Sequence, residues 1–307
     1  MSITCFLLSS LLTLVELNCE NLFDCRHDSL KQDIEFTPDG SRHWNTYRYW
    51  KKLNNTAQTI LSCDEKLPDL VALCEVENDT VLHDLTRRSL LRNAGYEYLM
   101  TQSPDLRGLD VALLYQPVSF HPLCYECITV PTLKGMRPTR DILYVQGRVA
   151  QADTLHLFIV HSPSRNGGEK ASRPFRMQVV QVLDSLLRPL QNKLVAVVGD
   201  FNDYYDSKPL QRLGHNKMVN ATQYTKGRQG NAQGTYRYHG NWHSLDHLFL
   251  SSSLFKCLLQ TYINDATFLL EDDTRYGGFH PRRTFNGLRY QPGFSDHLPL
   301  VAKFEIK

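Results

Sequence analysis

The chain has 307 residues, 42% hydrophobic and 10% aromatic, which is enough to bury a large core. Its 34 Lys and Arg residues nearly balance 32 Asp and Glu residues, so the net charge of +2 excludes binding of nucleic acid or acidic membranes through a strong overall field. Any phosphate binding must therefore be local.

The sequence shows no division into separate units. It contains no low-complexity tract, internal repeat or linker, so residues 1–307 are expected to form a single domain. Cys19 and Cys74 lie inside apolar runs, where thiols behave as small hydrophobes, and this favours a reducing, cytoplasmic compartment. Cys124 and Cys127 form one CxxC without a second pair, so neither a zinc site nor a redox site is expected.

The start of the chain is apolar and resembles a targeting segment over residues 1–15. No basic residue precedes it and no small-residue cleavage motif follows it, so a cytoplasmic protein is expected, with export left open. No stretch elsewhere is long and apolar enough to cross a bilayer. The sequence indicates no stable protein partner, and a monomer is expected.

Strand and helix patterns alternate through the middle of the chain. Strands are predicted over apolar runs at 11–18, 70–74, 96–100, 111–115, 142–149, 155–160, 194–198, 245–250 and after Pro299. Helices are predicted from helical spacing at 44–62, 81–94, 175–187 and 207–213. The second is closed by Gly95, and the third is expected to begin with Ser172 as its N-cap and Pro174 in its first turn. This order is typical of an α/β protein with mixed sheets in several layers.

The stretch KLVAVVGDFND at 193–203 joins a buried strand to side chains that suit a metal. Residues 194–198 are apolar and mostly β-branched, as in a strand covered on both faces. Gly199 permits a close turn, and the period of two then sends Asp200 and Asn202 to the same side. Their oxygens suit Mg²⁺ or Mn²⁺. On its own, the stretch is equally compatible with an Asp-Asn turn that caps a core strand.

Four other predicted strand ends carry polar residues of the same kinds, and a further aspartate lies near the start of 245–250. These residues are Asn18, Glu75, His161, Asp246, Asp296 and His297. Ligands and catalysts gather at strand ends in α/β folds, which favours one active site built from the whole chain. Two loops add Arg107 with Asp110, and Arg165, as candidates to contact a phosphate or a catalytic histidine.

With these residues in this order, the chain resembles the endonuclease/exonuclease/phosphatase superfamily over nearly its full length. The most specific segments are LNCENLFD, LCEVEN, RGLDVALLY, HSPSRNGG, VVGDFND, LDHLFLS and GFSDHLP. Other segments, GTYRYHGNW, TRDIL and YGGFHPRRT, are similar to an uncharacterised bacterial branch. The resemblance implies a four-layer sandwich, in which two mixed β-sheets pack face to face and helices flank them.

The resemblance also implies a role for each polar residue. The residues expected to hold Mg²⁺ (or Mn²⁺) offer oxygen ligands and are Asn18, Glu75 and Asp296. The residues expected to act on the nucleophile or the phosphate are His161, Asp200, Asn202, Asp246, His297 and, more distantly, Asp110. His297 is expected to pair with Asp246. Position, rather than the resemblance, favours a pair of His161 with Asp110. It also favours contact of Arg107 and Arg165 with the substrate phosphate, although both arginines are equally compatible with solvated surface charges.

The predicted function is a metal-dependent phosphodiesterase that uses water as the nucleophile and is nuclease-like, with DNA or RNA as substrate. One alternative keeps the metal site but acts on a lipid head-group, a nucleotide or another small phosphoester. A second alternative is a non-catalytic phosphate-binding protein, against which the complete polar set argues. Either Asp200 or His297 could activate the water, and the sequence does not separate them.

Overall fold

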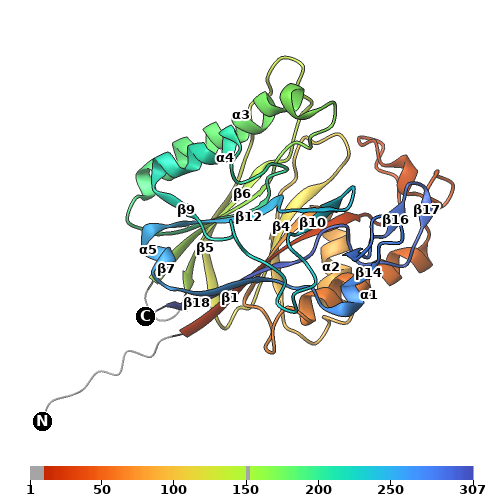
Figure 1. The fold of residues 1–307 in the computed structure, drawn as a ribbon, viewed down its shortest axis with the longest axis horizontal. Helices are drawn as coiled ribbons and strands as arrows, with labels where there is room; N and C mark the ends of the chain where they lie inside the picture. Colours follow the sequence, from red (N-terminus) through yellow and green to blue (C-terminus); the bar gives the residue numbers. More distant parts are fainter. Residues whose placement is uncertain (1–9, 150–152, 307) are drawn as a thin grey trace, which may run out of the picture.

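The computed structural model describes residues 10–149 and 153–306 (Figure 1). Residues 1–9 lie outside the described residues, and with them most of the apolar segment at 1–15 that resembles a targeting segment. Among the helices of the described ranges, none combines the length and the apolar character needed to span a membrane.

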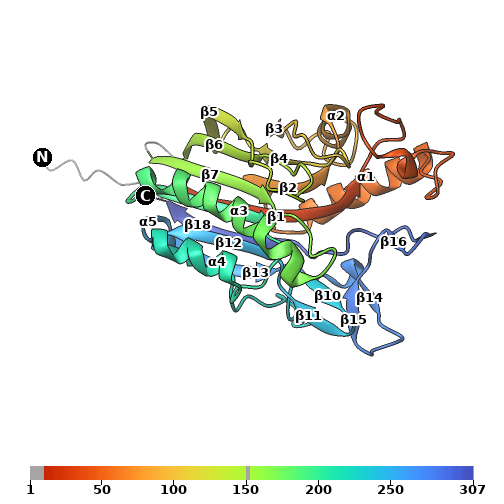
Figure 2. The same cartoon turned by 90° about the horizontal axis from the view of Figure 1, so that it is seen from above.

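Two six-stranded sheets pack face to face with helices outside them, so the expected four-layer α/β sandwich is confirmed (Figures 1 and 2). The first sheet has the order β13-β18-β1-β2-β4-β3, with β1 Ser10–Leu22, β2 Leu70–Val76, β3 Glu97–Met100, β4 Asp110–Tyr115, β13 Leu258–Ile263 and β18 Leu300–Ile306. The second has the order β5-β6-β7-β8-β12-β9, with β5 Phe120–Ile128, β6 Ile142–Val149, β7 Asp153–His161, β8 Leu194–Asp200, β9 Met218–Asn220 and β12 Asp246–Ser251.

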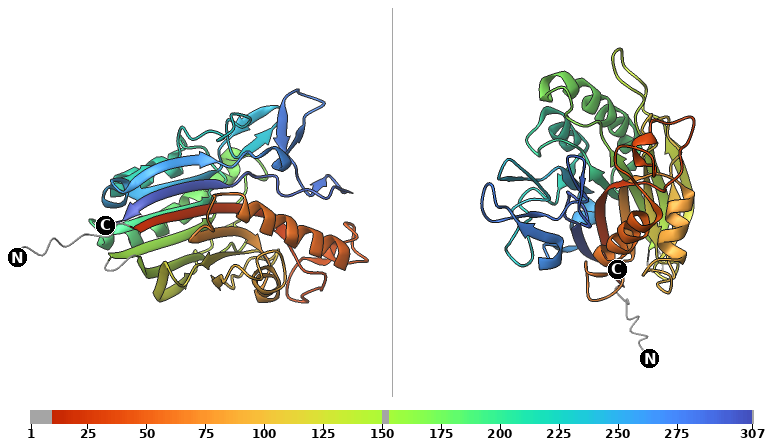
Figure 3. Two further views of the ribbon diagram at one scale, coloured as in Figure 1. Left: turned by 90° about the horizontal axis from the view of Figure 1, so that it is seen from below. Right: turned by 90° about the vertical axis from the view of Figure 1, so that its right-hand side faces the viewer.

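Helices cover the outer face of each sheet. Those on the first sheet are α1 Thr46–Leu61 and α2 Asp79–Arg87, and those on the second are α3 Glu169–Leu187 and α4 Lys208–Leu213, with the short α5 Ser252–Phe255 after β12. Three small hairpins lie at one end of the sandwich (Figures 2 and 3): β10 Tyr236–Tyr238 with β11 Asn241–His243, β14 Leu270–Asp272 with β15 Phe279–Pro281, and β16 Phe285–Asn286 with β17 Arg289–Tyr290.

The central strands are apolar on both faces because each face meets a different layer. In β1, Leu14 packs in the core between the two sheets, whereas Val15 packs under the helices of the first sheet. In β8, Val198 faces the other sheet and Val197 faces α3. A strand buried in this way is held rigidly, so the polar residues at its end are held rigidly too.

Two helix boundaries differ from the predicted ones. The helix predicted over 81–94 ends at Arg87, and Gly95 closes a run of turns rather than the helix. The helix predicted to begin with Ser172 as N-cap begins earlier, at Glu169 after Gly168, so that Ser172 and Pro174 lie inside it. Helix α2 begins where the Asn78 side chain accepts a hydrogen bond from the Val81 N–H at 3.0 Å.

A buried ion pair joins α3 to the loop that follows β8. Arg176 Nε donates to Asp203 Oδ2 at 2.9 Å, and both side chains are at most 2% exposed. Arg176→Ala should lower the free energy of unfolding by about 3–5 kcal/mol, because it leaves the Asp203 charge buried and unpaired. Denaturant unfolding measures this loss.

The matched control is Arg173→Ala, since Arg173 bonds to Glu169 on the exposed side of the same helix. Its loss should be much smaller because solvent screens that pair. Adding Asp203→Ala to Arg176→Ala should restore part of the stability. If Arg176→Ala and Arg173→Ala lower the free energy of unfolding equally, the buried ion pair contributes no more to stability than the exposed one.

Candidate active site

Strand register brings three of the predicted residues into one row. His161 on β7 is the register partner of Asp200 on β8, and Asp246 on β12 is its partner on the other side. The preceding residue, Gly199, has φ +147°, and a Cβ there would lie 1.9 Å from the Val160 carbonyl oxygen. Only glycine therefore lets β8 reach this position and deliver Asp200.

The first sheet delivers its residues at a bulge. The pairing of β1 with β2 shifts register between Asn18 and Leu22, and the pairing of β2 with β4 shifts between Cys74 and Val76. Glu75 lies in this second shift with φ +64°, a left-handed conformation that is uncommon for glutamate. The bulge turns the Glu75 side chain toward the second sheet.

These strand ends line one cavity of about 540 Å³, a volume suited to a small organic ligand. Most of the predicted residues line it: Asn18, Glu75, Arg107, His161, Arg165, Asp200, Asn202, Asp296 and His297. Asp246 lies behind His297 and is fully buried. Asp110 does not line the cavity.

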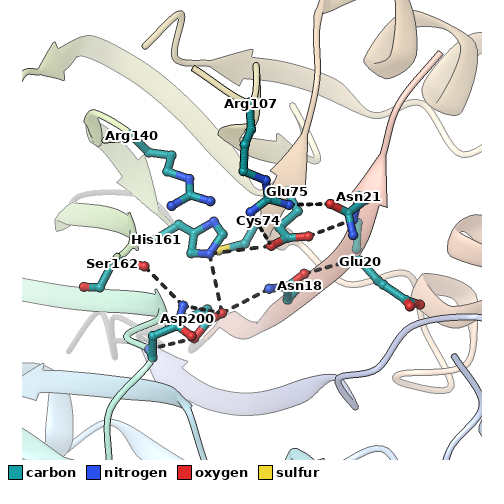
Figure 4. A network of polar contacts seen from close by, with 12 residues as sticks. Asn18, Glu20, Asn21, Cys74, Glu75, Arg107, Arg140, His161, Ser162 and Asp200 are labelled. Atoms are coloured by element: carbon teal, nitrogen blue, oxygen red, sulfur yellow. Dashed lines mark hydrogen bonds and ion pairs between the residues drawn. The ribbon is translucent and has the colours of Figure 1, made fainter. Parts of the chain in front are cut away.

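Asp200 lies at the centre of the polar network (Figure 4). Its Oδ2 accepts from Asn18 Nδ2 at 3.0 Å and from Asn202 Nδ2 at 3.1 Å, and its Oδ1 accepts from the Asn202 backbone N–H at 2.8 Å. Burial raises the pKa of Asp200 to about 7, and the nearby Asp246 carboxylate adds to the shift. This carboxylate can take up a proton near neutral pH.

His297 and Asp246 form a buried pair, as predicted. His297 Nδ1 lies 2.8 Å from Asp246 Oδ2 and 3.1 Å from Oδ1. Burial opposes the charge on the imidazole, but the carboxylates of Asp246 and Asp200 hold the pKa of His297 well above its usual range. His297 therefore carries a proton at neutral pH and offers its other ring nitrogen as a donor.

The pairing predicted between His161 and Asp110 is wrong. Asp110 Oδ1 instead accepts from the Ser103 backbone N–H at 2.9 Å and from the Thr101 hydroxyl at 2.5 Å, which orders the loop before β4. His161 Nε2 lies 3.6 Å from Asp200 Oδ2 and 3.8 Å from Glu75 Oε1. Burial, with the charges of Arg140 and Arg107, holds the pKa of His161 well below its usual range, so its imidazole is neutral.

The three residues expected to hold a divalent cation fit that task. In each of them the protein holds one oxygen and leaves coordinating capacity. Glu75 Oε2 accepts from the Asn21 N–H at 2.8 Å, and Asp296 Oδ2 accepts from Arg283 at 2.8 Å. Asn18 Oδ1 accepts a single bond, from the Glu20 N–H at 2.9 Å, and keeps a second lone pair. Such outer contacts orient oxygen ligands of the kind that Mg²⁺ and Mn²⁺ prefer.

A second grouping also has the geometry of a cation site. Asp200, Asp246 and His297 each bring one ligand atom within 4.8 Å of the others. However, both Asp246 oxygens already face His297 Nδ1, and Oδ2 also accepts from the Thr235 hydroxyl. The set of Glu75, Asn18 and Asp296 instead keeps oxygen lone pairs that no side chain or backbone group of the described residues uses.

One buried acid in this region was not predicted. Glu16 lies on β1 two residues before Asn18 and is 1% exposed, and neither carboxylate oxygen has a hydrogen-bond partner among the described residues. Burial holds the pKa of Glu16 well above its usual range, so it is neutral and adds no charge beside Asp246. The sequence could have indicated this buried acid, since a glutamate inside the apolar run LLTLVELN is unusual.

The cavity walls contain further residues that sequence patterns did not select. They are Asn21, Arg140, Ser164, Asn166, Glu169, Tyr204, Tyr236, Tyr238 and Leu245. Arg165 stacks on one of them, with its guanidinium carbon 4.2 Å from the Tyr204 ring centre. Another, Tyr236, lies with its ring centre 5.0 Å from that of His297. The tyrosines come from loops and short strands, where no periodic pattern marks them.

Two packed mixed sheets, with carboxylates, amides and histidines around one cavity at their strand ends, define a phosphoesterase of the α/β-sandwich class. The chain belongs to the Endonuclease/Exonuclease/phosphatase family, whose model matches residues 13–306. Enzymes of this family generally depend on a divalent metal. No curated protein matches the chain.

Solved structures share the fold at low sequence identity. A family protein from Bacteroides thetaiotaomicron matches with a TM-score of 0.63 and 15% identity, covering 97% of this chain and 99% of its own. A humanised D. rerio TDP2 matches with a TM-score of 0.60 and 15% sequence identity, covering 96% of this chain and 98% of its own. A mannosyl-6-phosphatase from Bacteroides thetaiotaomicron matches with a TM-score of 0.58 and 17% sequence identity, covering 95% of this chain and 98% of its own.

Proposed function

We propose that this protein is a Mg²⁺- or Mn²⁺-dependent phosphodiesterase that cleaves its substrate by attack of water. Glu75, Asn18 and Asp296 hold the cation, which neutralises phosphate charge as a Lewis acid when bound. The observation that carries the proposal is the Asp200 carboxylate, which is buried at the centre of the cavity with its pKa raised to about 7. A base with that pKa is matched to neutral pH.

In this proposal Asp200 and His297 have separate tasks. Asp200 accepts the proton of the attacking water, while Asn18 and Asn202 hold its oxygens in place. His297, which Asp246 keeps protonated, donates a hydrogen bond to a phosphate oxygen. Both pKa values are raised, and this supports the division: the Asp200 pKa is brought to about 7, so its carboxylate is ready to gain a proton, whereas the His297 pKa is held well above its usual range, so its imidazole already carries one.

The substrate we favour is nuclease-like, a diester of DNA or RNA. The cavity of about 540 Å³ has room for groups on both sides of a phosphate, and the stacked Arg165 and Tyr204 offer a flat surface to a base. The alternative is a lipid head-group, a nucleotide or another small phosphoester. The fold relatives named above include both TDP2 and a mannosyl-6-phosphatase, so resemblance alone does not select the substrate.

Hydrolysis should depend on a divalent cation. A chelator should abolish turnover, and saturating Mg²⁺ or Mn²⁺ should restore it. If the cation binds only the folded state, a hundredfold excess over its dissociation constant should stabilise the protein by about 2.7 kcal/mol, measured by thermal unfolding. Full activity in chelator would remove the metal from the mechanism.

A panel of substrates tests the function itself. Plasmid DNA, RNA, phosphoinositides, sphingomyelin and bis(p-nitrophenyl) phosphate are each incubated with the protein under Mg²⁺ and under Mn²⁺. Cleavage of the nucleic acids and of the synthetic diester is expected, with product release followed by gel and by absorbance. Cleavage confined to the lipids would support the alternative. Turnover of none of them would contradict the nuclease-like assignment and leave a small phosphoester outside the panel, or phosphate binding without catalysis.

A further inference from the structure

Arg140 is a buried cation without a hydrogen bond. It lies just before β6, its side chain is 6% exposed, and it lines the cavity. Nothing in the described ranges accepts a hydrogen bond from its guanidinium, and the nearest acid, Asp105, has Oδ2 3.6 Å from Nε. Burying a charge costs several kcal/mol unless good contacts offset it. This guanidinium is therefore placed for a ligand.

Two other arginines, both on α3, behave differently. Arg176 is as buried as Arg140, but its Nε donates to Asp203 at 2.9 Å and its Nη1 to Ser172 at 2.8 Å. Arg173 makes two hydrogen bonds to Glu169. Both therefore form hydrogen-bonded salt bridges, whereas Arg140 has only the longer contact with Asp105.

A second guanidinium shares the same wall. Arg107 lies beside Arg140 in Figure 4, and its Nη1 is 3.8 Å from Glu75 Oε1. Asp105 connects the two arginines, because its Oδ1 accepts from the Arg107 backbone N–H at 2.9 Å while its Oδ2 faces Arg140. Two neighbouring cations repel each other unless an anion lies between them.

In this arginine wall, Arg107 and Arg140, the guanidinium of Arg140 is separated from Asp200 by the imidazole of His161. His161 Nε2 faces Asp200 and Glu75, while Nδ1 has no hydrogen-bond partner among the described residues. Figure 4 shows Arg140 on the side of the ring away from Asp200. An anion bound by Arg140 therefore occupies a different place from a phosphate that water activated by Asp200 attacks.

We propose that Arg107 and Arg140 bind a second phosphate group of the substrate, next to the phosphate that is hydrolysed. The inference rests on the proposed function and names its substrate class: nucleotides or oligonucleotides that carry two phosphates one sugar apart. A planar guanidinium suits this task because it can give two parallel hydrogen bonds to phosphate oxygens.

Two chromogenic diesters test the subsite. One is the p-nitrophenyl phosphodiester of thymidine with a free sugar hydroxyl, and the other carries a second phosphate on that hydroxyl. The second should have a KM about tenfold to a hundredfold lower, as charge-assisted hydrogen bonds imply. Arg140→Gln should abolish this difference, and Arg140→Lys should keep part of it. Arg148→Gln, an exposed arginine on β6, is the matched control and should keep all of it.

Binding without turnover provides an independent measurement. In chelator, thymidine bisphosphate should bind the wild-type protein more tightly than thymidine monophosphate by a similar factor, and Arg140→Gln should remove the advantage. The thermal midpoint of unliganded Arg140→Gln should stay equal or rise, because the change removes a buried charge that has no hydrogen bond. A midpoint that falls, and that Arg140→Lys restores, would instead assign Arg140 to a structural pair with Asp105.

The outcomes separate the two proposals. If Arg140→Gln slows both diesters equally, Arg140 acts on the hydrolysed phosphate and the second subsite is refuted. If the wild-type protein hydrolyses neither diester, the proposed function fails, and the comparison of bisphosphate with monophosphate decides the inference alone. Equal binding of the two nucleotides would then reject it.

Discussion

Turnover should fall by about 10²- to 10⁴-fold when His297 is replaced by alanine, which is the usual contribution of a positioned proton donor or acceptor. Asp246→Ala should cause a comparable loss, because Asp246 holds the His297 ring through Nδ1 at 2.8 Å and keeps it charged. The double variant should be little worse than His297→Ala alone, since the two side chains act as one unit.

The measurement is kcat in excess Mg²⁺ for the four proteins of this cycle. Arg165 supplies the control, because it lies on a separate loop and stacks on Tyr204. His297→Ala combined with Arg165→Gln should give the product of the two single losses. Multiplicative losses for His297 and Asp246 would mean that Asp246 acts elsewhere, for example through its hydrogen bond from Thr235.

The second large effect concerns Asp200 and Glu75, for which we propose different roles, proton transfer for Asp200 and cation binding for Glu75. Asp200→Asn should lower turnover by about 10²- to 10⁴-fold, and excess Mn²⁺ should not restore it, because an amide cannot accept the proton of water. Glu75→Gln should weaken cation binding, so that high Mn²⁺ restores part of the activity. The contrast follows from their surroundings, since Asp200 accepts three hydrogen bonds whereas Glu75 Oε1 accepts none among the described residues.

Metal titration of the two variants measures this contrast. Activity is followed against Mn²⁺ concentration, and cation binding is measured separately by calorimetry. Asn202→Asp is an informative companion, because it keeps the shape of the residue that donates to Asp200 but replaces the donor by an acid. Equal rescue of Asp200→Asn and Glu75→Gln would show that the roles are divided wrongly.

Strand patterns predicted the fold class because the central strands are buried on both faces. The run over 194–198 is apolar throughout, and β8 indeed lies between β7 and β12 in the second sheet. Three strands of the two large sheets escaped prediction, β5, β9 and β13, and all three lie at a sheet edge. An edge strand is partly exposed, so its sequence is mixed, and β5 even contains Pro122 beside a bulge.

The candidate site could be predicted as a set of residues but not as a set of contacts. Residue type and position at a strand end depend on local sequence, which is why Glu75, Asp200 and His297 were all selected. Partners depend on register and on loops that cross the sandwich. Asp110 was paired with the wrong side chain for a different reason: its partners, Thr101 and Ser103, are close in sequence, but residue type does not show that the loop before β4 folds back onto its carboxylate.

For Arg140 too, the sequence identified the residue type but not its contacts. The segment TRDIL does not show whether its arginine forms a salt bridge or remains available to a ligand. The answer depends on whether an acid lies within hydrogen-bond distance after folding. The nearest acid, Asp105, comes from another loop and stops at 3.6 Å. Local sequence therefore specifies which chemical groups reach the cavity. Long-range packing decides which of them are already paired and which remain free to bind a substrate.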